Sequence, residues 1–249
     1  MADYDNRVLR GQAGAQAGLY DAGLRAYMLR VYNYMLVGLS LTGVTAWLTA
    51  NTAFGALFIQ QTVVNGHLAI GMTGLGLVAL FAPLGLVLFL SFRIQKMSVS
   101  AAQTTFWIYA GLMGISIAPV LLVYTGASVA QVFFITAATF GAMSLYGYTT
   151  GRDLSGFGSF LFMGLIGIII ASVVNMFVHS SMMQFVISVI GVLIFTGLTA
   201  YDTQSIKESY SANMDGTASG RGAIMGALRL YLDFVNLFLM LIQLLGNRR

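Results

Sequence analysis

Two aspartates and one arginine lie where this sequence otherwise has few ionisable residues: Arg93, Asp202 and Asp233. Asp233 lies inside the last apolar stretch, 223–245, which would form a helix of roughly 34 Å, enough to cross a bilayer core of about 30 Å. A carboxylate at that depth costs on the order of 2.5–3.5 kcal/mol, unless it faces protein or water and is paired or protonated. Ionisable residues inside membrane segments are usually functional, so Asp233 is the first candidate site residue.

The three residues are expected at a similar depth, because Asp202 ends the preceding apolar segment and Arg93 ends the second one. If the two carboxyls meet in a low dielectric, they cannot both ionise cheaply and would share one proton. Such a pair would act as a proton sensor. When fully ionised, it suits a hard cation such as Ca²⁺, or attracts Arg93. We therefore predict a pH-sensitive gate at Asp202, Asp233 and Arg93, with Asp202 and Asp233 as the candidate metal ligands.

Simpler interpretations remain open for each residue. Arg229 lies one helical turn before Asp233 and could neutralise it as a structural ion pair. Asp202 could be an ordinary acid at a helix end. His67 and His179 both lie at helix ends on the outer side of the membrane, without nearby acids or cysteines. They make a weak case for a metal site, and an interfacial role is favoured.

Composition identifies the class of protein. The 249 residues are 58% hydrophobic and 8% charged, whereas soluble domains carry about 25% charged residues. The chain is therefore an integral membrane protein. It has no cysteine, which excludes disulfides, thiolate nucleophiles and Cys-ligated metals. The net charge of +4 reflects loop charges and is poor support for nucleic-acid binding. No cleavable signal peptide is apparent.

The polar segments divide the chain into two parts. Residues 1–30 form a polar tail, whose low-complexity stretch at 12–18 we expect to be mobile, and residues 31–249 form the membrane domain. Uncharged runs between charged or polar loops predict seven transmembrane helices in an all-α fold, at 32–50, 67–91, 104–124, 129–148, 157–177, 184–201 and 223–245.

The distribution of Lys and Arg predicts the orientation. These residues lie in the tail and in alternate loops, and the other loops have none, so the N-terminus is expected in the cytoplasm. Seven crossings would then place Arg248 and Arg249 outside. Two arginines outside would be a mild violation of the positive-inside rule, which leaves open that the last helix is re-entrant or shallow.

Small residues and prolines predict how the helices pack. Residues that let helix backbones approach closely recur at four-residue spacing: Ala110, Gly114 and Ala118 in one helix, and Gly167 and Ala171 in another. Pro83 and Pro119 should kink the second and third helices.

Enzyme motifs fit poorly. Tyr201-Asp202 resembles half of the intramembrane aspartyl protease pair, but the second motif would need glycines where this chain has Leu230-Tyr-Leu-Asp233. A retinal protein would need a lysine in the last helix, which has none. Neither a phosphate-binding G-x-x-x-x-G-K-[ST] loop nor an H-E-x-x-H pair is present. We expect no enzyme activity and no bound cofactor.

Two C-terminal motifs carry a family resemblance: Thr-Gly-Leu-Thr-Ala-Tyr-Asp-Thr-Gln-Ser-Ile-Lys at 196–207 and Leu-Tyr-Leu-Asp-Phe-Val-Asn-Leu-Phe at 230–238. Together with Gly-Arg-Asp-Leu-Ser-Gly-Phe-Gly-Ser-Phe at 151–160, they strongly resemble the Bax inhibitor family, in its bacterial branch. The resemblance covers about residues 32–245. It implies six helices around a central C-terminal helix, and a pH-sensitive calcium leak with Asp202 and Asp233 as sensor and Arg93 as latch.

Two functional hypotheses follow. The first is a proton-gated Ca²⁺ leak channel in a bacterial inner membrane, with Ca²⁺ bound weakly as the permeant ion. The second is a non-conducting regulator that binds a membrane protease or another membrane protein through residues 1–30. Some bacterial relatives of that second kind lack the aspartate pair, and this chain keeps both acids.

Overall fold

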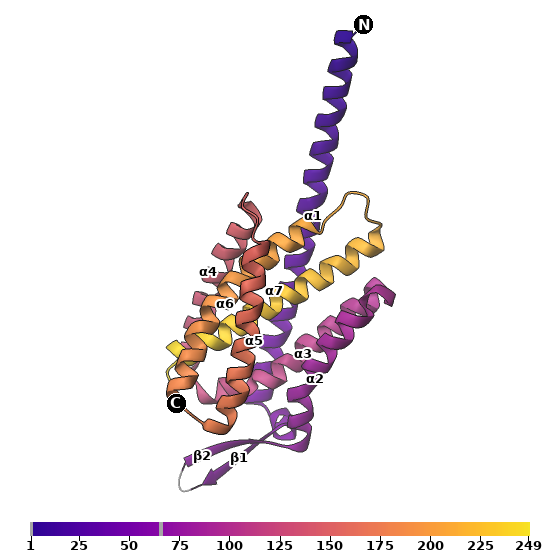
Figure 1. Cartoon of the computed structure of the whole chain (residues 1–249). Coiled ribbons are helices and arrows are strands. Elements are labelled where there is room, and N and C mark those ends of the chain that lie inside the picture. The colour runs from indigo at the N-terminus through magenta and orange to yellow at the C-terminus, as the bar shows by residue number, and fades with distance from the viewer. Residues whose placement is uncertain (1, 65–66) are drawn as a thin grey trace.

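The computed structural model describes the backbone at residues 2–64 and 67–249, and the side chains of that part except at 2–20, 61–64 and 67–70. This part folds into seven α-helices and one β-hairpin (Figure 1). The helices are α1 (Ala2–Asn51), α2 (Gly74–Arg93), α3 (Val99–Val123), α4 (Gly126–Thr149), α5 (Ser155–Val178), α6 (Ser181–Glu208) and α7 (Gly216–Leu245). Short 3-10 helices lie at Ala53–Leu57 and Ile94–Lys96, and the strands are β1 (Ile59–Val64) and β2 (His67–Met72).

Six of the helices, α2 to α7, are long and apolar enough to cross a membrane, counting only the described residues. An all-α membrane fold is therefore confirmed at this level. α7 has 30 residues, so it is about 45 Å long and runs from one end of the bundle to the other. Its C-terminal end reaches the α3–α4 turn, where the Thr125 N–H donates to the Asn247 carbonyl at 3.0 Å and the Arg249 N–H donates to the Val123 carbonyl at 2.9 Å.

Polar side chains start five of these helices. The side chains of Thr73, Ser98, Thr125, Ser180 and Asp215 each accept a hydrogen bond from the backbone N–H three residues later. These bonds satisfy donors that a helix leaves free at its first turn. The predicted spans were drawn from apolar runs, which leave out polar capping residues and first turns. Helices α3, α4, α6 and α7 therefore begin several residues earlier than predicted.

The second predicted span is wrong at its start. Residues 59–72 form an antiparallel hairpin in which Ile59 pairs with Met72, and α2 begins only at Gly74. Strand β1 has the sequence Ile-Gln-Gln-Thr-Val-Val, and β-branched residues favour extended backbone. Thr73 then caps α2 by accepting from the Gly76 N–H at 3.0 Å. Hydrophobicity alone does not separate a short strand from a helix end.

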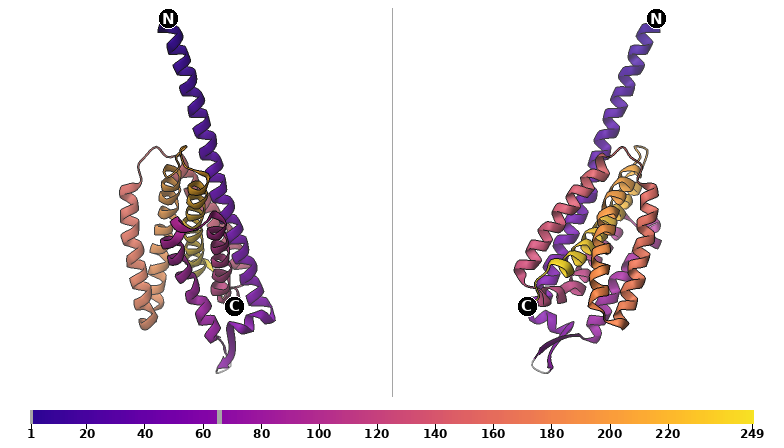
Figure 2. Two further views of the ribbon diagram at one scale, coloured as in Figure 1. Left: turned by 90° about the vertical axis from the view of Figure 1, so that its right-hand side faces the viewer. Right: turned by 60° about the vertical axis from the view of Figure 1, so that its left-hand side comes forward.

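The N-terminal segment also differs from the prediction. Helix α1 runs without interruption from Ala2 to Asn51, so the backbone of the polar tail is helical, including the stretch 12–18 that was expected to be mobile, and it projects beyond the other helices (Figures 1 and 2). The segment contains no proline, and its alanines, leucines and arginines have high helix propensity and outnumber its glycines.

Helix α7 is the most buried of the membrane-length helices. It packs against α1, α3, α4 and α6, whereas α2 packs mainly on α3 and α5 mainly on α6. The C-terminal helix is thus central, as expected, but its main neighbours are four helices rather than six. The two outer helices, α2 and α5, leave space between them beside α7.

Small residues bring α1 and α3 together, as predicted for the first group. Ala110 and Gly114 are buried, and a Cβ added to Gly114 would collide with the Thr42 carbonyl of α1. The Thr42 hydroxyl also donates to the Ala110 carbonyl at 2.8 Å. Gly167 and Ala171 of α5 do not form such a close helix contact, because a Cβ on Gly167 would meet open space.

Pro83 in α2 has a specific effect on packing. A proline inside a helix has no N–H, so the carbonyl of the residue four positions earlier, Ala79, loses its helical partner. The Ser116 hydroxyl of α3 donates to this carbonyl at 2.7 Å. The proline therefore creates a polar contact between α2 and α3.

Candidate functional site

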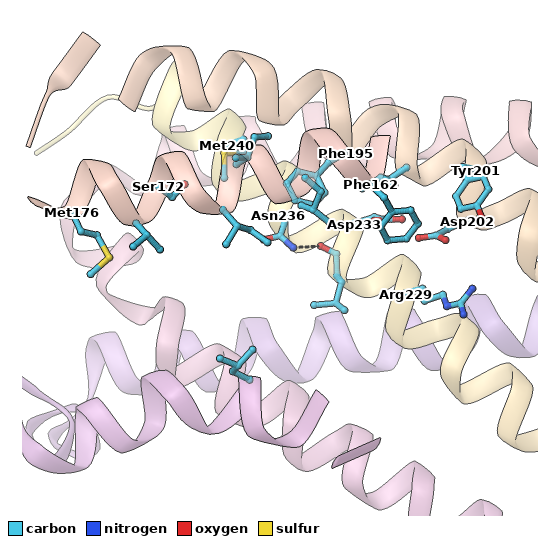
Figure 3. Close-up of a pocket in the computed structure, with 17 residues that line it drawn as sticks. Phe162, Ser172, Met176, Phe195, Tyr201, Asp202, Arg229, Asp233, Asn236 and Met240 are labelled. Carbon is cyan, nitrogen blue, oxygen red and sulfur yellow. Dashed lines mark hydrogen bonds between the residues drawn. The ribbon is translucent and has the colours of Figure 1, made fainter. Parts of the chain in front are cut away.

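Asp202 of α6 and Asp233 of α7 meet inside the bundle. Their side chains are only 7% and 4% exposed, and both line one cavity (Figure 3). The two carboxyls lie close enough for the charge of Asp202 to act on Asp233. Two carboxylates this close in a site of low dielectric repel each other, so a state in which one of them carries a proton is favoured.

One oxygen of the pair has no partner. Asp233 Oδ2 is buried and makes no hydrogen bond within the described part of the chain. Buried polar atoms are almost always hydrogen-bonded, and one left unpaired costs about 1–3 kcal/mol. Asp233 therefore offers a free acceptor to a proton, a cation or a ligand that enters the cavity.

Arg229 is the charged neighbour of the pair. It lies one turn before Asp233 on α7, is exposed, lines the same cavity and acts electrostatically on both carboxyls. Between these described residues, no arginine nitrogen lies within the 4.0 Å of a salt bridge to either acid. The structure thus shows Arg229 within electrostatic range of the pair but unpaired with it.

Arg93 lies elsewhere. It is the exposed last residue of α2 and is not among the groups that act on either carboxyl. Helix α2 contributes Leu84 to the cavity, roughly 13 Å along the helix before Arg93. The structure therefore brings together two of the three predicted site residues, and places Arg229 where Arg93 was expected. The latch role of Arg93 stays a prediction.

The cavity has a volume of about 770 Å³ and a polar and an apolar end. The carboxyl pair, Arg229 and Tyr201 lie at one end, and Met176 lies at the other (Figure 3). Asn236 lines the middle, with its amide donating to the Leu232 carbonyl at 2.9 Å. Helices α5, α6 and α7 supply every lining residue except Leu84, which comes from α2.

Gln204, two residues after Asp202, holds the end of α6 in place. This buried side chain donates to the Arg152 carbonyl at 2.7 Å and accepts from the Leu154 N–H at 2.8 Å. It therefore binds the α4–α5 loop to the helix that carries Asp202. Sequence reasoning missed this role, although a glutamine inside a helix end next to a candidate acid was a usable signal.

A second set of polar contacts positions the other face of α6. The Thr203 hydroxyl lies 3.0 Å from the Ser144 hydroxyl of α4, which in turn lies 2.7 Å from the Tyr32 hydroxyl of α1. The backbones of α4 and α6 also approach closely, since a Cβ on Gly147 would collide with the Ala200 carbonyl. Asp202 is thus carried on a helix end that is fixed on both sides.

The described residues contain no cluster of three or more His, Cys, Asp or Glu side chains that could hold a metal. Ca²⁺ prefers six to eight oxygen ligands, and the carboxyl pair supplies at most four. His179 is exposed at the end of α5, with its Nδ1 3.1 Å from the Phe177 carbonyl, and the side chain of His67 lies outside the described residues.

Comparisons with known proteins agree with this architecture. A family model described as "Inhibitor of apoptosis-promoting Bax1" matches residues 24–249. The protein RP147 of Rickettsia prowazekii is 49% identical over 230 residues, 92% of this chain and 93% of its own length. The "Inner membrane protein YbhL" of Escherichia coli is 46% identical over 92% of this chain and 94% of its own length. A protein of Caulobacter vibrioides is 43% identical over the full length of both chains.

Proposed function

The chain belongs to the Bax inhibitor-1 family of membrane proteins, and from this premise we propose that it is a proton-gated Ca²⁺ leak channel of a bacterial inner membrane. The observation that carries the proposal is the buried carboxyl pair that lines a cavity of about 770 Å³, with one Asp233 oxygen that has no hydrogen-bond partner among the described residues. An acid pair in such a place serves both to attract a cation and to sense protons.

In this proposal α1 is the seventh span, and the N-terminus lies in the cytoplasm. The alternation of the helices puts Arg93, Lys96, Arg152 and Lys207 at the same end of the bundle as the exposed part of α1. The positive-inside rule then assigns this end to the cytoplasm. The name of the Escherichia coli relative supports the inner membrane as the location.

Gating follows from the charges around the pair. With both carboxyls ionised, their double charge attracts Arg229, which is tethered one turn away and so competes strongly with free Ca²⁺. A salt bridge there fills the polar end of the cavity and closes it. When the pair takes up a proton it loses half of its charge, Arg229 is released, and one negative charge remains to attract cations. Flux is therefore expected to rise as the pH falls.

The test is Ca²⁺ uptake into proteoliposomes that contain the purified protein and an internal Ca²⁺ indicator. Wild type should pass Ca²⁺ at a rate that depends on pH, whereas Asp202→Asn and Asp233→Asn should lose that dependence. Wild-type pH profiles in both variants would exclude the carboxyl pair from gating. Absence of flux at every pH would exclude the channel.

A second candidate function is a non-conducting regulator of a membrane protease or another membrane protein. The observation that favours it is the helical extension of α1 beyond the bundle, a surface available to a cytoplasmic partner. This function predicts no flux at any pH, together with copurifying membrane proteins that are lost when residues 1–30 are deleted.

A further inference from the structure

We propose that the cavity beside α7 is a binding site for a phospholipid with a primary-amine headgroup, whose ammonium group is held by Asp202 and Asp233, whose phosphate is held by Arg229, and whose acyl chain lies along α5. The inference involves the same carboxyls as the proposed channel but does not depend on ion conduction.

The cavity opens sideways, toward the hydrocarbon of the membrane. Its lining includes the apolar side chains of Leu84, Ile169, Val173 and Met176, which are 59%, 54%, 50% and 71% exposed. Helix α2 packs mainly on α3 and α5 on α6, so the helices that carry these side chains are not closed against each other. The volume of about 770 Å³ lies within the range of about 300–1,000 Å³ that is typical of ligand sites. This wall suits a flexible acyl chain.

The polar end lies at the depth of a lipid headgroup. Asp202 is about 9 Å from the end of α6 at Glu208, because a helix rises about 1.5 Å per residue. That end also carries Lys207, whose ammonium donates to the Tyr148 carbonyl at 2.8 Å. A phospholipid of the leaflet on this side can therefore place its headgroup at the carboxyl pair while its chain follows α5 toward Met176, at the apolar end shown in Figure 3.

The charges at this end select the headgroup. Asp233 lines the cavity, and its buried Oδ2 has no donor among the described residues, so a headgroup that carries N–H groups can satisfy it. Arg229 is exposed in the same cavity and makes no salt bridge with either acid within the described part of the chain, and guanidinium groups bind phosphate well. Phosphatidylethanolamine carries an ammonium and a phosphate joined by an ethylene linker, which matches two acids beside one arginine. Phosphatidylcholine has no N–H to donate, and a purely anionic headgroup would be repelled by the acids.

The test measures lipid retention directly. Full-length protein is purified from nanodiscs that contain equal parts of phosphatidylethanolamine, phosphatidylcholine and phosphatidylglycerol with identical chains, and the bound lipid is identified by native mass spectrometry. Wild type should retain phosphatidylethanolamine over phosphatidylcholine by about tenfold, the value of one charge-assisted hydrogen bond. Asp233→Asn and Arg229→Gln should each reduce this preference. Val173→Trp, which fills the cavity wall, should reduce retention of all lipids.

The matched control is Asp153→Asn, which removes an exposed acid outside the cavity and should leave the preference unchanged. Thermal unfolding of each variant in detergent separates loss of the site from loss of the fold. Equal retention of the ethanolamine and choline lipids by wild type, preferred retention of phosphatidylglycerol, or an unchanged preference in folded Asp233→Asn would each overturn the inference. Ethanolamine selectivity without Ca²⁺ flux would refute the channel alone, and flux without selectivity would refute the lipid site alone.

Discussion

Replacing Arg229 by glutamine tests the gating mechanism most directly, because it removes the proposed latch and leaves both carboxyls in place. Arg229 is exposed and lies beyond 4.0 Å from each acid, so the attraction is screened by solvent. In high dielectric, two unit charges about 4 Å apart attract by about 1 kcal/mol. Protonation of one carboxyl removes that attraction and therefore lowers the equilibrium constant for binding of Arg229 to the pair by about fivefold.

We expect wild-type Ca²⁺ uptake to be about fivefold faster on the acidic side of the pair's titration than on the alkaline side, on the basis of that attraction. Arg229→Gln should give the fast rate at every pH, as should Asp233→Asn. High salt should also speed wild-type uptake at alkaline pH, since it screens the exposed arginine. The assay is the same proteoliposome measurement, with the pH stepped equally on both sides of the membrane.

The matched control is Arg93→Gln, an exposed arginine of the same charge that does not line the cavity. It should keep the wild-type pH profile. If Ca²⁺ uptake by Arg229→Gln still slows at alkaline pH, Arg229 is not the latch. If the uptake rate of Arg93→Gln is instead independent of pH, Arg93 is the latch.

Three further predictions concern the support of the site. Gln204→Ala removes two hydrogen bonds between α6 and the α4–α5 loop and should lower the free energy of unfolding by about 1–3 kcal/mol, measured by chemical denaturation in detergent. Gly147→Ala forces α4 away from the Ala200 carbonyl and should lower the melting temperature, whereas Gly141→Ala on the same helix meets open space and should not. Thr42→Val leaves the buried Tyr231 hydroxyl without its 2.6 Å partner and should destabilise the protein by about 1–3 kcal/mol by the same measurement.

The candidate site could be predicted only in part. Asp202 and Asp233 were identified because each is an acid in or beside an apolar run, and the order of the helices placed both at one end of the bundle. Their contact required the packing of α6 on α7. The choice between Arg93 and Arg229 could not be made from the sequence, because both lie at a suitable depth and depth says nothing about which side of a helix faces the acids.

The hairpin and the N-terminal helix show a different limit. At 67–72 the hydrophobic pattern continued into α2, and only the pairing of β2 with β1 distinguished a strand from the start of a longer helix. At 12–18 the low-complexity sequence predicted a mobile stretch within the polar tail. Good local helix formers, continuous with the first apolar segment, instead extend α1 as a single helix.

Composition and the order of apolar and charged segments determined by themselves that this is a helical membrane protein, and which acids lie in or beside its apolar segments. These properties depend on the cost of placing polar groups in hydrocarbon, which is summed residue by residue along the chain. The tertiary structure alone decided that the two carboxyls meet, that Asp233 Oδ2 lacks a partner in the part of the chain that the structure describes, and that a cavity opens between α2 and α5. Such features depend on the rotation and close packing of helices far apart in sequence, which no local pattern records.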